Sequence, residues 1–235
     1  MRAWNERSRQ SAQVVLPRVF HVCRPRSAID VGCGFGAWAG ECLRLGADRV
    51  VGVDGDHVAR DELVIPGEMF VTHDLTQPLR MEHRFDLATS LEVAHYLPES
   101  RAAGFVADLC KLAPLVLFSA AIPYQGGIGH VNEQWPTWWA ERFAQHGYTP
   151  VDCIRDEVWE DERVAGWYAQ NTLLFVAADA QVPALDGHPG WGRCPPRVHP
   201  ELYITYADGR YQRLRRRVAA ALELTARPRP RNSRS

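Results

Sequence analysis

Residues 28–36 read Ala28-Ile29-Asp30-Val31-Gly32-Cys33-Gly34-Phe35-Gly36, an apolar run that ends in three glycines at alternate positions. The apolar run predicts a buried strand. The helix-compatible residues 37–45, which stop at Gly46, predict a helix directly after the glycines. A strand, a glycine loop and a helix in this order begin an α/β sheet, in which ligands bind beyond the carboxyl ends of the strands. The glycines therefore predict a loop whose backbone can approach a ligand closely.

Short apolar runs bounded by polar residues recur along the chain and predict six further strands. Helices are predicted at 98–112, from Pro136 to a stop at Gly147, and at 8–23 as a covering helix before the first strand. Strands that alternate with helices indicate an α/β fold. We expect a Rossmann-like, mostly parallel seven-stranded sheet flanked by helices, with the last strand antiparallel. The six further strands are expected at 50–54, 69–72, 85–89, 115–119, 149–154 and 172–176.

The 235 residues are enough for one substantial core and indicate a single domain with an extension. Glycine and proline become frequent after Ala180, so we predict a domain at 1–180 and a partly disordered Pro/Gly- and Arg-rich extension at 181–235. Residues 210–235 carry nine arginines and one glutamate, a net charge of +8, whereas the rest of the chain carries −9. Such a tail is typical of nucleic-acid partners, but arginine- and proline-rich ends are more often solvated and unstructured. A helix at about 211–224 is compatible with the sequence.

Composition excludes several classes of protein. The chain has one lysine, Lys111, which stands in neither a P-loop nor a pocket suited to Schiff-base chemistry. The six cysteines form no C-x-x-C pair and show no zinc-type spacing, so we expect free, mostly buried thiols and a cytoplasmic protein. The first residues lack a hydrophobic signal core, and the longest apolar run, 112–123, is too short to span a bilayer. We therefore expect no membrane partner.

Acidic residues accompany the first three strands. Asp30 stands two residues before the first glycine, Asp54 ends the second strand, and Asp74 follows the third. Read as G-x-G-x-x-A, the loop also satisfies the dinucleotide fingerprint, so an NAD(P)-dependent oxidoreductase stays an alternative. A carboxylate suits a vicinal diol as a bidentate acceptor, whereas a pyrophosphate prefers less acidity around it. The three acids thus favour a ligand that carries a ribose and no pyrophosphate.

With these features the chain resembles the class I S-adenosylmethionine-dependent methyltransferases. The resemblance runs over about residues 27–178, through residues 28–36, Val51-Gly52-Val53-Asp54, His73-Asp74-Leu75 and Phe85-Asp86-Leu87-Ala88-Thr89-Ser90-Leu91-Glu92. It implies S-adenosylmethionine as the cofactor, with the glycine loop around its methionine part, Asp54 on the ribose and Asp74 with Leu75 at the adenine. It also implies that residues 90–92 line the wall near the transferred methyl. The cofactor-binding residues expected are Asp30, Gly32, Cys33, Gly34, Gly36, Asp54, Gly55, Asp74, Leu75, Ser90, Leu91 and Glu92.

A narrower resemblance concerns the segment after the fifth strand. Ser119-Ala120-Ala121-Ile122-Pro123, the run GGIGHVNEQWP at 126–136 and Trp167-Tyr168-Ala169-Gln170-Asn171 are similar to a bacterial subgroup among small-molecule and saccharide biosynthesis methyltransferases. This resemblance implies a small-molecule acceptor, such as a sugar or a natural product, and we expect its methylation on oxygen. The identity of the acceptor and the oligomeric state are not specified by the sequence.

An alcohol acceptor must lose a proton as it attacks a methyl group, so a base is expected. His130 is the first candidate, and Glu133 is either the second or the group that orients the imidazole. The alternative for His130 is a hydrogen bond to the loop backbone. His95 is a weaker candidate because it lies one position away from the histidine that the subgroup usually carries. No metal-ligand spacing is evident, so we predict no catalytic metal.

Three other functions compete with small-molecule methylation. A nucleic-acid methyltransferase would use the arginine-rich tail, but the Asn/Asp-Pro-Pro-Tyr/Phe signature is absent where this chain has Ser90-Leu91-Glu92-Val93. The acidic body also disfavours phosphate binding, so nucleic acid is not the expected partner. A non-catalytic cofactor-binding regulator and the oxidoreductase are the two remaining alternatives.

Overall fold

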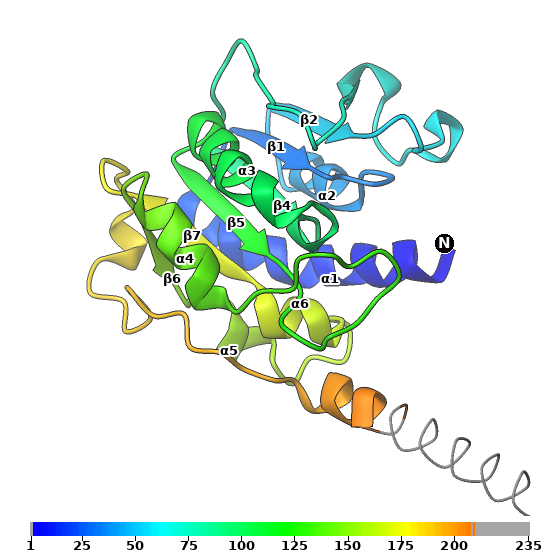
Figure 1. Ribbon diagram of the computed structural model, residues 1–235. Helices are drawn as coiled ribbons and strands as arrows, with labels where there is room; N and C mark the ends of the chain where they lie inside the picture. The colour runs from blue at the N-terminus through cyan, green and yellow to red at the C-terminus, as the bar shows by residue number, and fades with distance from the viewer. Residues whose placement is uncertain (1, 208, 210–235) are drawn as a thin grey trace, which may run out of the picture. The chain divides into compact units, whose positions relative to one another are not determined.

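A seven-stranded sheet runs through the centre of the chain (Figure 1) in a computed structural model that describes residues 2–207 and 209. The strand order is β3-β2-β1-β4-β5-β7-β6. All neighbouring strands pair in parallel except β7, which is antiparallel to both β5 and β6. This confirms the expected fold. The strands are β1 (Ser27–Val31), β2 (Arg49–Asp54), β3 (Phe70–Thr72), β4 (Leu87–Leu91), β5 (Leu115–Ser119), β6 (Tyr148–Val151) and β7 (Leu173–Ala177).

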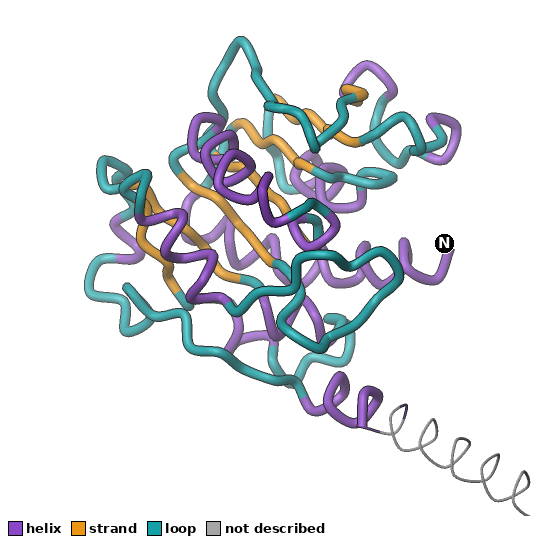
Figure 2. Tube along the Cα trace, in the orientation of Figure 1, coloured by secondary structure: helices purple, strands orange, loops and turns teal. Residues whose placement is uncertain are grey.

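Helices cover both faces of the sheet (Figure 2), as a buried parallel sheet requires. The side chains of α1, α2 and α6 enter one apolar core, and those of α3 and α4 enter the other. In Figure 1, α3 and α4 lie on the near face and α1 on the far face. The helices are α1 (Arg2–Cys23), α2 (Ala37–Arg44), α3 (Glu99–Leu112), α4 (Pro136–Ala144), α5 (Arg155–Val158) and α6 (Gly166–Asn171).

The order of the strands reverses between β1 and β4. The chain passes from β1 to β2 and β3 on one side, and then crosses to β4 on the other side of β1. At such a switch point the loops after the two central strands diverge and leave a crevice at the carboxyl edge of the sheet. The glycine loop after β1 and the segment after β4 therefore frame the same opening.

The fourth strand begins two residues later than expected, at Leu87. Asp86 lies outside the ladder because its carboxylate accepts hydrogen bonds from the backbone N–H groups of Arg26 and Ser27 at the start of β1, at 2.9 and 2.8 Å. Helices α5 and α6 were not predicted, since segments of four and six residues are too short to show helical periodicity.

The first compact unit extends past Ala180 to His199, and the described residues from Pro200 onward, helical at 200–207, form part of a second unit. Residues beyond Ala180 pack closely, since Leu185 is buried and Trp191 forms a β-bridge with Val151. The helix predicted at 211–224 and the arginine-rich tail lie outside the described residues.

None of the described helices combines the length and the apolar character needed to cross a bilayer. All six cysteines are free thiols.

Candidate active site

A cavity of about 720 Å³ opens at the carboxyl edge of the sheet, where the switch point predicts it. Its walls come from the segments that follow the first four strands, at 32–34, 54–57, 72–76 and 92–97. Four carboxylates line it, and no lysine or arginine does so among the described residues. The cavity is therefore suited to a ligand with positive charge. Seven of the residues expected from the sequence line it: Gly32, Gly34, Asp54, Gly55, Asp74, Leu75 and Glu92.

The glycine loop requires glycine for two different reasons at two positions. Gly32 has φ +81°, and a Cβ atom there would come within 2.3 Å of a methyl group of Val93. Gly34 has φ +53°, but a Cβ atom there would meet no protein atom within 4 Å. Gly32 thus allows close packing of the loop on the segment after β4, whereas Gly34 leaves its backbone open toward the cavity.

Asp54 joins the end of β2 to the glycine loop. Its Oδ2 atom accepts a hydrogen bond from the backbone N–H of Gly34, and its Oδ1 atom accepts one from Gly55, both at 2.7 Å. His57 Nε2 lies 3.5 Å from the same Oδ1 atom. A carboxylate offers about four acceptor sites, so two remain for a diol in the cavity. The geometry fits the ribose-binding role expected of Asp54.

Asp30 lies buried below the loop. Its Oδ1 atom accepts a hydrogen bond of 2.7 Å from the Thr89 hydroxyl, while Oδ2 is buried and accepts none of normal geometry from the described residues. Burial raises the pKa of Asp30 to about 7, and the charge of Asp54 adds to this effect. A buried carboxylate oxygen without a normal hydrogen bond is unfavourable. Asp30 is not among the residues that line the cavity, so its direct contact with a ligand stays a prediction.

Five expected cofactor residues are not among those that line the cavity. Asp30 lies beneath the loop, Cys33 packs against Gly52, and Gly36 precedes the first turn of α2. Ser90 and Leu91 are buried within β4. These residues lie in or next to the elements that carry the lining residues, without lining the cavity themselves. Their expected roles as direct ligands of the cofactor stay predictions.

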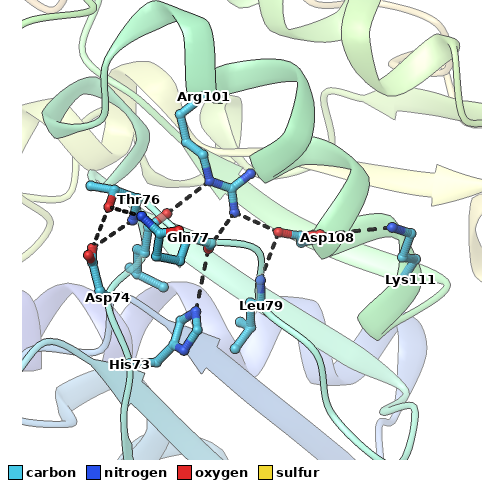
Figure 3. Close-up of polar contacts among 9 residues, drawn as sticks. His73, Asp74, Thr76, Gln77, Leu79, Arg101, Asp108 and Lys111 are labelled. Atoms are coloured by element: carbon cyan, nitrogen blue, oxygen red, sulfur yellow. Dashed lines mark hydrogen bonds and ion pairs between the residues drawn. The ribbon is translucent and has the colours of Figure 1, made fainter.

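The segment after β3 is fixed by a polar network that reaches α3 (Figure 3). Asp74 Oδ1 accepts hydrogen bonds from the backbone N–H and the hydroxyl of Thr76, which closes a tight turn. The Arg101 guanidinium donates to the carbonyl oxygens of Leu75 and Gln77 at 3.1 and 2.9 Å. Arg101 also donates to Asp108, at 2.6 Å. The wall expected to meet the adenine is thus held by a charged side chain that sequence reasoning missed.

The loop at 121–134 after β5 closes around Glu133. The Glu133 carboxylate accepts hydrogen bonds from the backbone N–H groups of Tyr124 and Gly126, at 2.8 and 2.7 Å. It also hydrogen-bonds Nδ1 of His130 at 2.9 Å. The structure therefore brings His130 and Glu133 together as expected, but neither residue is among those that line the cavity. The catalytic role of this pair stays a prediction.

His95 anchors this loop from the side of the cavity. Its buried Nδ1 atom accepts a hydrogen bond of 2.9 Å from the Ala121 N–H, which requires a neutral ring at that nitrogen. Burial lowers the pKa of His95 to about 3. Its ring lies 4.0 Å from that of His130 and 4.4 Å from that of Tyr96, a cavity residue. These contacts place the loop beside the cavity. The catalytic role expected of His95 stays a prediction.

Glu92 is the lining residue that connects the cavity to the loop and to α6. Its Oε2 atom accepts a hydrogen bond from Gln125, and its Oε1 atom accepts one from Asn171, each at 3.0 Å. Sequence reasoning singled out neither amide. The only available signal was the Gln170-Asn171 pair at the end of a run already noted for its resemblance.

Within the described residues no three metal-ligating side chains form a group, and the absence of a metal stays a prediction.

The fold and the site together define a class of protein, the Rossmann-like methyltransferases with a cavity at the carboxyl edge of the sheet. Residues 4–156 match the family described as "Methyltransferase domain". Because this match spans more than half of the chain, the chain belongs to that family. The match covers the strands and loops that form the cavity.

Similar proteins agree with this assignment. The ribosomal protein L11 methyltransferase of Shewanella piezotolerans is 31% identical over 103 residues, which are 40% of this chain and 29% of that protein. DesVI of Streptomyces venezuelae has the same fold, with a TM-score of 0.55 and 13% identity over 74% of this chain and 93% of that chain. Human N-acetylserotonin methyltransferase, solved in complex with SAM, aligns with a TM-score of 0.50 and 17% identity. That alignment covers 71% of this chain and 51% of the human chain. The expectation of S-adenosylmethionine as cofactor agrees with these findings.

Proposed function

We propose that this protein is an S-adenosylmethionine-dependent methyltransferase of the cytoplasm that methylates a small molecule. One observation carries the proposal: the cavity at the switch point is lined by Asp54, Asp56, Asp74 and Glu92, with no lysine or arginine among the described lining residues. S-adenosylmethionine carries a sulfonium and an ammonium group, which such a cavity attracts. A dinucleotide pyrophosphate would be repelled.

The residues present fit this cofactor. Gly34 exposes its backbone to the cavity, the two remaining acceptor sites of Asp54 suit the ribose hydroxyls, and the turn at Asp74 with Leu75 suits the adenine. Oδ2 of Asp30 lies below the loop, where it suits the ammonium group. When bound, the cofactor supplies an electrophilic methyl group. The protein contributes alignment of the acceptor and exclusion of water.

The acceptor we favour is a hydroxyl group of a sugar or natural-product-like molecule, in line with the loop at 126–136. Its proton needs a base. The sequence predicts His130, oriented by Glu133, for this role; the two are in hydrogen-bond contact but are not among the residues that line the cavity. His130→Gln tests this role. Undiminished turnover with normal cofactor binding would assign His130 to loop structure.

The experiment is a transfer assay with methyl-tritiated S-adenosylmethionine and three separate acceptor pools: a low-mass cell extract of the organism that carries this chain, its nucleic acids, and its proteins. We expect label in the low-mass pool, unchanged when the chain is truncated after Gly209. Label in nucleic acid that disappears on truncation would contradict the proposal and assign the arginine-rich tail to substrate binding. Cofactor binding without transfer to any pool would instead support a non-catalytic regulator.

A further inference from the structure

Glu92 has an unusual backbone conformation at the edge of the cavity. Its φ of +59° lies in the left-handed region, which a glutamate rarely adopts. Strained residues of this kind cluster at active sites. The Glu92 N–H donates to both the carbonyl oxygen and the hydroxyl of Ser119 at the end of β5, each at 3.0 Å. This contact fixes the turn, so that the side chain lines the cavity.

Two carboxamides from distant segments hold the Glu92 carboxylate. Gln125 in the loop after β5 donates to one oxygen, and Asn171 at the end of α6 donates to the other. Asn171 also donates to Oε1 of Gln125 at 2.9 Å, which orients both amides. Each carboxylate oxygen keeps a further acceptor site. The group is therefore rigid and still able to take a proton.

The surroundings of Glu92 bring the pKa of its carboxyl group close to neutral pH. Burial raises the pKa of Glu92 to about 7, partly opposed by the hydrogen bonds from Asn171, Gln125 and Ser119. The titratable groups that face it are Glu133 from the loop, Tyr96 from the segment after β4, and Tyr168 from α6. None of the three carries positive charge. A base is most effective when its pKa lies near the working pH.

We propose that Glu92 is the catalytic base, and that Gln125 and Asn171 position its carboxylate toward the transferred methyl. The proposal rests on the proposed function. As the acceptor oxygen bonds to the methyl carbon, its proton passes to Glu92. The carbon–sulfur bond breaks with its electron pair on sulfur, which leaves neutral S-adenosylhomocysteine. His130, which does not line the cavity, then serves loop structure through Glu133.

The first test uses sinefungin, an analogue in which an amine-bearing carbon replaces the methylated sulfur. Calorimetry compares its affinity with that of S-adenosylhomocysteine between pH 6 and pH 8. In the wild-type protein the preference for sinefungin should rise as Glu92 ionises with increasing pH. In Glu92→Gln this preference should fall about tenfold at pH 8 and no longer depend on pH, because a charge-assisted hydrogen bond is lost.

Three further variants test whether the change in sinefungin preference is due to the Glu92 carboxylate. Asp48→Asn removes an exposed carboxylate that is paired with Arg26 and does not line the cavity, so the ratio of the two affinities should stay unchanged. Asn171→Ala removes a donor to Glu92, so the midpoint of the pH dependence should move to higher pH. Glu92→Asp keeps the carboxylate and should keep a pH-dependent preference; it also serves as the working variant if Glu92→Gln fails to fold.

The second test repeats the tritium-transfer assay with the low-mass extract. Glu92→Gln should bind S-adenosylhomocysteine normally but transfer at least a hundredfold less label than the wild-type protein. An unchanged sinefungin preference in Glu92→Gln, or full transfer by it, would overturn the role of Glu92. Failure of the wild-type protein to bind S-adenosylhomocysteine would instead refute the proposed function.

Discussion

Asp30 makes the folded protein less stable as the pH rises. Its pKa of about 7 exceeds the ordinary value of an aspartate, because burial disfavours the charged form. Between about pH 4 and pH 7 the folded protein therefore binds this proton more tightly than the unfolded chain does. Stability is highest below this window, falls as the pH rises through it, and stays low above it. A bound ammonium group would offset the loss.

Asp30→Asn should separate stability from binding. The variant removes the buried charge, so its free energy of unfolding should exceed that of the wild type by a difference that grows from pH 5 to pH 8, up to about 3 kcal/mol. Its affinity for S-adenosylhomocysteine should fall. Urea unfolding and calorimetry measure the two effects. Asp48→Asn, on an exposed carboxylate paired with Arg26, is the control and should change neither. A pH-independent stability difference for Asp30→Asn would contradict this account.

The glycine loop is an element in which two similar substitutions should act differently. Gly34→Ala places a methyl group where no protein atom lies within 4 Å, so we expect a loss of stability of only about 1–2 kcal/mol from the positive φ. The affinity for S-adenosylhomocysteine should fall at least tenfold, because the methyl group enters the cavity. Gly32→Ala meets Val93 and should mainly destabilise the fold. Thermal unfolding with ligand titration checks both variants. Normal binding by Gly34→Ala would show that the loop does not contact the cofactor.

The contact between α3 and the segment after β3 gives a prediction with a matched control. Arg101→Met leaves Asp108 as a buried charge without its main partner, which typically costs about 3–5 kcal/mol, and frees the carbonyl groups of Leu75 and Gln77 (Figure 3). Lys111 lies 3.9 Å from the same Asp108 but is largely exposed, so Lys111→Met should cost less than about 1 kcal/mol. Urea unfolding measures both variants. Arg101→Met should also weaken S-adenosylhomocysteine binding, and equal effects of the two variants would contradict the role of Arg101.

Across the whole molecule, the sequence predicted what short-range patterns encode. Each strand lies within about two residues of its expected position, because buried apolar runs and their polar ends are local features; the exception is β6, which ends at Val151, three residues earlier than expected. The acids at the ends of β2 and β3 could also be placed at the cavity from the sequence, because parallel strands end at the same edge of the sheet. The boundary drawn at Ala180 rested on glycine and proline content alone, which does not reveal that Leu185 is buried.

The parts of the site that sequence reasoning missed depend on contacts between distant segments. Asn171 meets Glu92 across 79 positions of the chain, and Arg101 meets Leu75 across 26. Such pairs leave no periodic signal in a single sequence. Glu92 was expected only as part of the cavity wall. Its left-handed backbone and its two amide partners became visible once α6 and the loop after β5 were placed beside β4.

The net charge of the whole chain does not reveal the acidity of the part that forms the cavity. A net charge of −1 combines an acidic body with an arginine-rich end that lies outside the described residues. The cavity is acidic like the body, with four acids in its walls and no lysine or arginine among the described lining residues. Electrostatics of this kind selects a cationic cofactor over a pyrophosphate.

Calorimetric titration of the full chain with S-adenosylhomocysteine and with NAD distinguishes a methyltransferase from a dinucleotide-dependent enzyme. We expect one S-adenosylhomocysteine site per chain and no heat with NAD. We also expect at least tenfold weaker S-adenosylhomocysteine binding by an Asp54→Ala variant that still unfolds cooperatively. The variant loses the carboxylate that accepts hydrogen bonds from Gly34 and Gly55 and that is proposed to bind the ribose. Binding of NAD alone, or S-adenosylhomocysteine binding that Asp54→Ala leaves unchanged, would contradict the proposal that this cavity binds S-adenosylmethionine.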